Sequence, residues 1–408
     1  MNRRCCVREG RWLAVVALVT AIAGAGCAES EAEAEAEADR AAVRAEMGVI
    51  YGSLYTLLPL SVDDQAFRSP AEREKIREAL ASLAKGAEHV ADHVAGDDRR
   101  VHYLANALSR ETREAMLRFD QERYEGAQFL VRRFTDFCVA CHTRVPSAAD
   151  SPLAAGFVSA DTLGRLPTAQ RATVQVATRR FDDALATYEK LFASKAVAPA
   201  EMLAPLMEYL RVCLRVKNDV ERPRNTLMGF ATRPDLWSNL RGDVEDWIAA
   251  LYRAAETPSD PPSVARARAL LDEAQRVMRY PTDRRGLVQQ LLASGELHRY
   301  LEGRAGKSGP DIAEAYYLLG LIETRTKLDY IVSEGEFYLE TAIRLAPGDP
   351  VGQAAFDLLE EETVIGWTGS SGSHMPEDVR AHLDELRALV EAAALVEAAA
   401  PSNTSDAR

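Results

Sequence analysis

Apolar residues recur at helical spacing along most of this chain, and that pattern limits the chain to an all-α fold. The clearest example is a seam that repeats every seven residues: Ile76, Leu80, Leu83, Ala87, Val90 and Val94. A seam of this kind buries one face of a helix against its neighbours. The chain has 408 residues, 47% of them apolar, which is enough for two domains that each have a core. We therefore predict two all-α domains.

The charge balance excludes one broad class of function. Lys and Arg number 49 against 62 Asp and Glu, which gives a formal net charge of −13. Nucleic-acid binding depends on a basic surface that neutralises phosphates. We therefore expect no nucleic-acid partner.

The amino-terminal segment has the features of an export signal. Four arginines precede an apolar run from Trp12 to Ala23, and small residues follow it up to Cys27. The run is too short to cross a membrane, which takes about 20 apolar residues. The ending resembles a bacterial lipoprotein signal, in which the cysteine carries the lipid, although Gly24 stands where that pattern usually has Leu. We expect a periplasmic protein anchored to the outer membrane through Cys27; the alternative is a simple secretory peptide.

The sequence divides into six segments. They are a signal peptide (1–26), an acidic spacer (27–39), a four-helix bundle (40–146), a linker (147–168), a helical-repeat-like domain (169–398) and a disordered tail (399–408). The bundle is predicted from four stretches of helical periodicity joined by short turns, the first ending near Pro59 and the second opening at Ser69 and Pro70.

Cys138, Cys141 and His142 form a C-x-x-C-H sequence, the attachment signal for c-type haem. Positions 138 and 141 are one helical turn apart, so both sulfur atoms can reach the two vinyl groups of one porphyrin. The imidazole of His142 can reach the iron from the same turn. A thioredoxin-type redox pair would need a βαβ setting, and a zinc site would need further ligands. We therefore predict one covalent haem c per chain.

A four-helix bundle with this motif near the end of its last helix resembles the class II cytochromes c, the cytochrome c′ family. The resemblance covers residues 40–146 and implies that Cys138 and Cys141 form the thioethers and that His142 is the proximal iron ligand. Pro146 ends the fourth helix earlier than is usual in the family. The second domain lies outside the family pattern.

The sixth iron ligand decides between electron transfer and gas binding. Met47, His93 and His102 fall at the end of the bundle where the proximal histidine is expected. His93 shares a helix line with the small residues Ala79 and Gly86, which would leave room for a flat cofactor. We favour His93 as the ligand; Met47, which low-spin members of the family use in helix one, and an open site are the alternatives.

The second domain contains stretches that resemble tetratricopeptide repeats, in which small residues let paired helices approach. The best match runs from Ala313 through Gly320 to Pro347. The other residues that could take part in chemistry give weaker evidence of a functional role. Cys213 is expected to be a buried thiol, and His298 is expected at the surface.

Together these features predict an exported monohaem c-type cytochrome that carries single electrons, with a helical-repeat domain that docks a redox partner protein. No Ser-His-Asp set, paired-metal cluster or dinucleotide fingerprint points to an enzyme, and no small-molecule substrate is indicated. Two alternatives stay open. The chain could be a haem-based gas or redox sensor, or an assembly or scaffold lipoprotein in which the haem is secondary.

Overall fold

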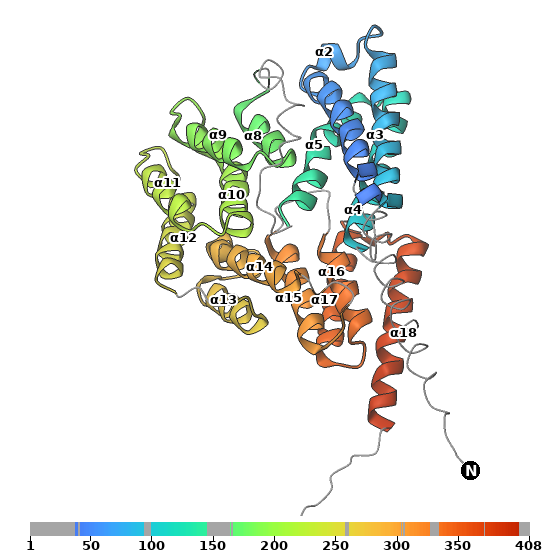
Figure 1. The fold of residues 1–408 in the computed structure, drawn as a ribbon, viewed down its shortest axis with the longest axis vertical. Helices are drawn as coiled ribbons and strands as arrows, with labels where there is room; N and C mark the ends of the chain where they lie inside the picture. The colour runs from blue at the N-terminus through green and yellow to red at the C-terminus, as the bar shows by residue number, and fades with distance from the viewer. Residues whose placement is uncertain are drawn as a thin grey trace, which may run out of the picture.

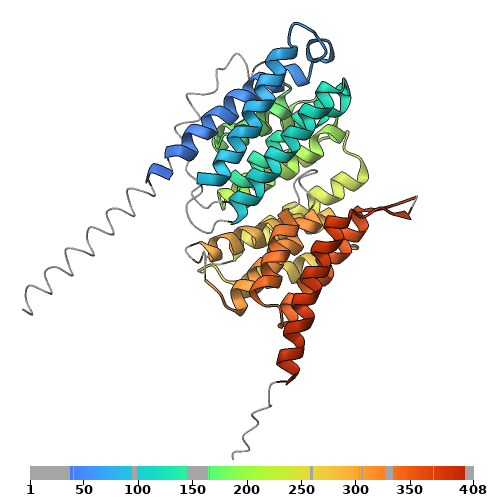
Figure 2. The same ribbon diagram turned by 90° about the vertical axis from the view of Figure 1, so that its right-hand side faces the viewer.

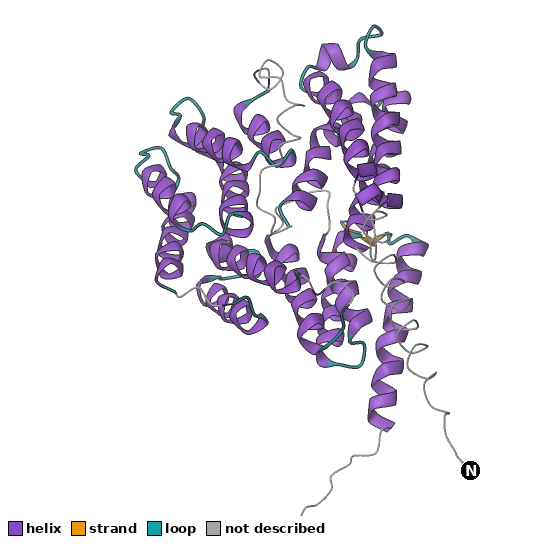
Figure 3. Cartoon of the chain, in the orientation of Figure 1, coloured by secondary structure: helices purple, strands orange, loops and turns teal. Residues whose placement is uncertain are grey.

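A computed structural model describes most of the chain after the spacer. The described residues are 37–39, 41–93, 99–144, 164, 166–257, 261–302, 304, 307–326, 334–370 and 372–399. The signal peptide, most of the spacer, most of the linker and the tail lie outside them. The described part is helical apart from one two-stranded hairpin, which confirms the all-α prediction (Figure 3). None of the described helices is long and apolar enough to cross a membrane.

Four long helices form the amino-terminal bundle (Figures 1 and 2). They are an unlabelled first helix (residues 41–61), α3 (Arg73–His93), α4 (Arg99–Asp120) and α5 (Tyr124–His142), with the one-turn helix α2 (Asp64–Phe67) after the first. Their apolar faces enclose one core, which includes Leu57, Leu80 and Phe134. The side chain of Asp63 caps α2 by accepting hydrogen bonds from two backbone N–H groups, each at 3.0 Å.

The helix boundaries differ from the prediction by a few residues. The first helix continues past Pro59 to residue 61, and α3 begins at Arg73 because residues 70–72 form a turn. Only three residues separate α4 from α5, and Glu122 among them adopts a left-handed backbone with φ 62°. Such a residue reverses the chain sharply, which lets the last two helices pack side by side.

The rest of the chain is built of shorter packed helices. In chain order the first group comprises α8 (Thr168–Ala177), α9 (Phe181–Ala193), η1 (Pro199–Met202), α10 (Leu203–Arg211), the π-helical turn η2 (Val212–Val216), α11 (Glu221–Ala231), α12 (Ser238–Glu256), α13 (Val264–Val277), η3 (Arg284–Gly286) and α14 (Leu287–Leu301). The second group comprises α15 (Pro310–Thr326), α16 (Glu334–Leu345), α17 (Pro350–Gly366), β1 (Thr368–Gly369), β2 (Gly372–Ser373) and α18 (Glu377–Ala399).

Helices α15 and α16 approach each other closely at Gly320. A Cβ atom added at Gly320 would lie 2.6 Å from the side chain of Leu339, so only glycine fits there. The stretch after α17 contains the antiparallel hairpin of β1 and β2, with Thr368 opposite Ser373. The hairpin projects from the end of α17 in Figure 2.

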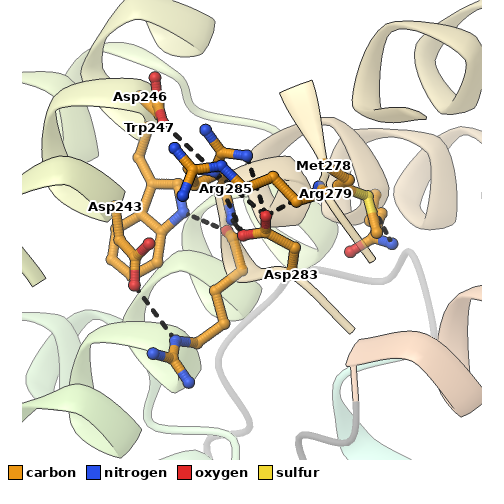
Figure 4. A network of polar contacts seen from close by, with 9 residues as sticks. Asp243, Asp246, Trp247, Met278, Arg279, Asp283 and Arg285 are labelled. Carbon is orange, nitrogen blue, oxygen red and sulfur yellow. Dashed lines mark hydrogen bonds and ion pairs between the residues drawn. The ribbon is translucent and has the colours of Figure 1, made fainter. Parts of the chain in front are cut away.

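Figure 4 shows a polar network that fastens η3 to α12. The carboxylate of Asp283 accepts hydrogen bonds from the backbone N–H groups of Arg279 (2.9 Å) and Arg285 (3.2 Å) and pairs with the Arg285 guanidinium. Burial alone would raise the pKa of Asp283, but these hydrogen bonds hold it below its ordinary value of 3.8. The indole of Trp247 donates to the carbonyl oxygen of Arg284 at 2.6 Å. This network is structural, because each of its polar groups is used to hold a turn in place.

The bundle and the helices that follow it share side chains across their boundary. Val139 of α5 lies in the core formed mainly by α8 to α14. Conversely, Leu166 and Val174 lie in the core of the bundle. Helix α8 is therefore packed on both sides, between the bundle and the rest of the chain.

Candidate haem-attachment site

The C-x-x-C-H residues occupy the last turn and a half of α5. Cys138, Cys141 and His142 all line one cavity inside the bundle. The helical spacing predicted this convergence, because residues three and four apart lie on the same helix face. The remaining lining is apolar and comes from the first helix, α3, α4 and α5: Ile50, Ala87, Val90, Val101, Leu104, Ala105, Leu108 and Phe137.

Met47 also lines this cavity, and its thioether sulfur is an atom that can bind a metal. It is partly buried and belongs to the bundle core. Thioether sulfur is a known axial ligand of haem iron. The structure therefore brings together Met47, both cysteines and His142.

His93 does not reach the cavity. It is the last residue of α3 and its side chain is exposed. The line that it shares with Gly86 was expected to leave room for a cofactor, but that line faces the first helix. A Cβ atom at Gly86 would lie 3.1 Å from Cγ1 of Ile50, so the glycine serves helix packing. His102 lies on another side, in a hollow formed with Tyr103 and three residues of α16.

A hydrogen bond from outside the bundle orients His142. Its Nδ1 atom lies 2.6 Å from the carbonyl oxygen of Ala177, the last residue of α8. Burial lowers the pKa of His142 to about 4, although the hydrogen bond to this carbonyl raises the pKa by a smaller amount. The ring is therefore neutral and carries its one proton on Nδ1, because a carbonyl oxygen can only accept. The lone pair of Nε2 remains available to a metal.

The environment of the Cys138 thiol differs from that of a reactive redox pair. Burial, followed by the charge of Cys141, raises the pKa of Cys138 to about 12. Reactive C-x-x-C thiols have lowered pKa values and lie at helix N-termini, whereas this pair lies at a C-terminus. No disulfide joins them. Within the described residues there is also no group of three or more His, Cys, Asp or Glu side chains placed to hold a metal ion on its own.

The chemistry of the donor set fits c-type haem, although the space between the helices is small. The cavity measures about 40 Å³, whereas pockets for ligands of cofactor size measure about 300–1,000 Å³. An apolar core closes over any space without partner atoms, since voids forfeit dispersion contacts. Cys138, Cys141 and His142 would hold a porphyrin through two thioethers and the imidazole, and the helices around the cavity would have to separate to admit it.

A second hollow lies on the other side of α5. It is a cleft of about 590 Å³ between α5 and the helices α8 and α10. Three guanidinium groups, those of Arg132, Arg133 and Arg211, line it together with two carboxylates. Arg133 pairs with Asp136 at 2.6 Å, so part of this charge is neutralised locally.

Sequence reasoning missed a buried group of charged and polar side chains next to the bundle. Arg144 pairs with Glu334, and Arg215 pairs with Glu323 at 2.5 Å. His298, expected at the surface, is only 5% exposed, and neither of its ring nitrogens has a hydrogen-bond partner among the residues that the structure describes. Charged residues usually mark solvated faces, so no signal in the sequence separated these from the rest. Cys213 is buried, as predicted.

Comparisons with known proteins do not assign a function, so the function is inferred from this site. No protein-family model matches the chain, and searches of curated proteins and of solved structures find no similar protein.

Proposed function

We propose that this chain is an exported monohaem c-type cytochrome that carries single electrons. The observation that carries the proposal is the convergence of Cys138, Cys141 and His142 with Met47 on one apolar cavity in a helical bundle. Covalently bound haem supplies reversible one-electron chemistry. The chain's own residues hold the ring through two thioethers, supply the proximal imidazole and surround the porphyrin with apolar side chains.

The thiols' environment supports attachment before the bundle closes. A thiol with a pKa of about 12, as burial gives Cys138, holds almost no thiolate at neutral pH. The cavity of about 40 Å³ would also exclude the ring. The two cysteines would therefore be joined to haem while the chain is still open, and the first helix, α3 and α4 would pack around it afterwards.

Haem staining after denaturing electrophoresis tests the proposal. Protein made together with a cytochrome c maturation system should give a haem-stained band at its own mass, and that band should vanish in Cys138→Ala/Cys141→Ala. Cys213→Ala is the matched control, because Cys213 is a buried cysteine outside the bundle core. The proposal fails if the wild-type protein carries no covalent haem, or if the double variant still does.

Localisation is a separate part of the proposal. The small-residue ending before Cys27 and the acidic spacer behind it favour a lipid anchor in the outer membrane. Cys27→Ser should release the protein into the soluble periplasmic fraction. Unchanged membrane association of that variant would refute the anchor while leaving the haem site untouched.

The sensor alternative and the scaffold alternative predict different results. A gas sensor would have a five-coordinate, high-spin ferrous spectrum, whereas an electron carrier with Met47 on the iron would be low-spin. A scaffold would keep its activity in cells when Cys138 and Cys141 are replaced. We favour electron transfer because Met47 supplies a second ligating atom on the cavity.

The helices from α8 to α18 are proposed to dock a redox partner protein. The support for this docking role is the repeat-like pairing of α15 with α16, in which Gly320 allows the two helices to come into close contact. Arrays of paired helices commonly present extended binding surfaces.

A further inference from the structure

The end of α8 presents one carbonyl oxygen to the bundle. The preceding carbonyls accept hydrogen bonds from the turn that follows the helix: Val174 from Thr178 N (3.0 Å), Gln175 from Arg180 N (2.8 Å) and Val176 from Arg179 N (2.9 Å). The carbonyl of Ala177 accepts instead from the imidazole of His142. The chain reverses at Arg179, whose left-handed φ of 59° is typical of a helix end.

This arrangement makes the imidazole electron-rich. The C-terminal end of a helix carries a partial negative charge, and here it points at the Nδ1–H group of His142. A hydrogen bond from the far nitrogen of a ligating histidine to such an acceptor fixes the tautomer and raises the basicity of the other nitrogen. A more basic ligand stabilises ferric iron relative to ferrous iron.

We propose that α8, which belongs to the second domain, is part of the haem site: its terminal carbonyl positions His142 and lowers the reduction potential of the haem. This inference rests on the proposed function and adds a role for the second domain besides partner docking. Ala177 is a positioning residue, since it acts on the iron only through His142.

The second domain holds the end of α5 at two points, which keeps this hydrogen bond in place. One point is the carbonyl of Ala177. The other is Glu334 of α16, which pairs with Arg144, two residues after His142. The Arg144 guanidinium also lies over the ring of Tyr338, 5.3 Å from its centroid. Val174, in turn, seats α8 in the bundle core. A change in how the two domains pack would therefore reach the iron through His142.

The test weakens one carbonyl in the full-length, haem-loaded protein. Replacing Thr178 by its α-hydroxy acid analogue converts the peptide bond after Ala177 into an ester, whose carbonyl is a weaker acceptor. The matched control is the same replacement of Ser194, the residue after α9. Each change also removes one N–H group that caps a helix, that of Thr178 to Val174 and that of Ser194 to Leu191.

Three readouts separate positioning from a merely structural effect. The ester at Thr178 should raise the reduction potential and speed exchange of the Nδ1 proton in the ferrous protein about tenfold. Combined with Met47→Ala, which should leave the ferrous haem five-coordinate, it should also lower the iron–histidine stretching frequency. The ester at Ser194 should change none of them. Equal effects of the two esters, or no effect at Thr178, would overturn the inference.

A measurement on the wild-type protein keeps the inference testable if the ester variant does not fold. The Nδ1 proton of His142 should exchange slowly and show nuclear Overhauser contacts to α8. Fast exchange in the folded protein would refute the hydrogen bond. Absence of covalent haem would instead refute the proposed function, so the two failures are distinguishable.

Discussion

Nη2 of Arg215 donates a hydrogen bond to Oε1 of Glu323 at 2.5 Å, and the two side chains are only 1% and 6% exposed. The arginine lies on the π-helical turn η2 and the glutamate on α15, so the pair joins segments that are 108 residues apart. Burial would raise the pKa of Glu323, but the charges of Arg215, Arg211 and Arg144 hold it below its ordinary value of 4.5. Both partners are therefore charged at neutral pH.

Breaking this pair should destabilise the protein strongly. Glu323→Ala leaves the Arg215 charge buried without its partner, which costs about 3–5 kcal/mol of unfolding free energy. Arg215→Met with Glu323→Leu removes both charges and should recover most of that loss. Urea unfolding followed by circular dichroism measures both values. A single variant within about 0.5 kcal/mol of wild type would show that the pair contributes little.

His298 should make stability depend on pH. Burial, followed by the charges of Arg215, Arg100, Arg144 and Arg299, lowers its pKa well below the ordinary 6.5. The unfolded chain then binds a proton that the folded chain excludes. Stability is therefore complete above about pH 6.5 and falls as the pH drops below it, by up to about 1.4 kcal/mol per pH unit.

Replacing His298 by Leu provides the control for that pH dependence. The variant should lose this part of the slope between pH 6.5 and 5. It should be no less stable at pH 8, because both ring nitrogens lack hydrogen-bond partners in the described structure and leucine has no polar group to bury. Unfolding midpoints at several pH values measure the slope. Equal slopes for wild type and variant would show that another group causes it.

Gly320→Ala should destabilise the contact between α15 and α16. The added Cβ would lie 2.6 Å from Cγ of Leu339 and 3.2 Å from its backbone nitrogen. Overpacking of this kind costs about 1–3 kcal/mol. Gly242→Ala in α12 is the control, since nothing lies within 4 Å of its added Cβ. That change should stabilise the helix by roughly 0.5–1 kcal/mol, and the opposite order of the two midpoints would contradict the packing.

Replacing Met47 should alter the haem spectrum more than replacing His93. Met47 lines the cavity with His142, whereas His93 is exposed at the end of α3. If the proposed function holds, Met47→Ala should convert the ferrous spectrum to high-spin and speed carbon monoxide binding, while His93→Ala leaves both unchanged. A spectrum altered only by His93→Ala would return the ligand to α3.

The sequence alone determined the features that depend on near neighbours along the chain. The helical period placed the long helices of the bundle to within a few residues, because each position is set by contacts three or four residues away. The C-x-x-C-H spacing placed Cys138, Cys141 and His142 on one face of α5 for the same reason. The burial of Cys213 followed from its apolar neighbours in sequence.

Tertiary structure decided what depends on how helices pack against one another. The line through Gly86 and His93 was visible in the sequence, but only packing showed that it faces the first helix rather than the cavity. The partner of His142, the carbonyl of Ala177, lies 35 residues along the chain, and every residue has such a carbonyl. His298 and the pair of Arg215 with Glu323 are buried because helices from distant parts of the chain close over them, and periodicity within one helix carries no information about that closure.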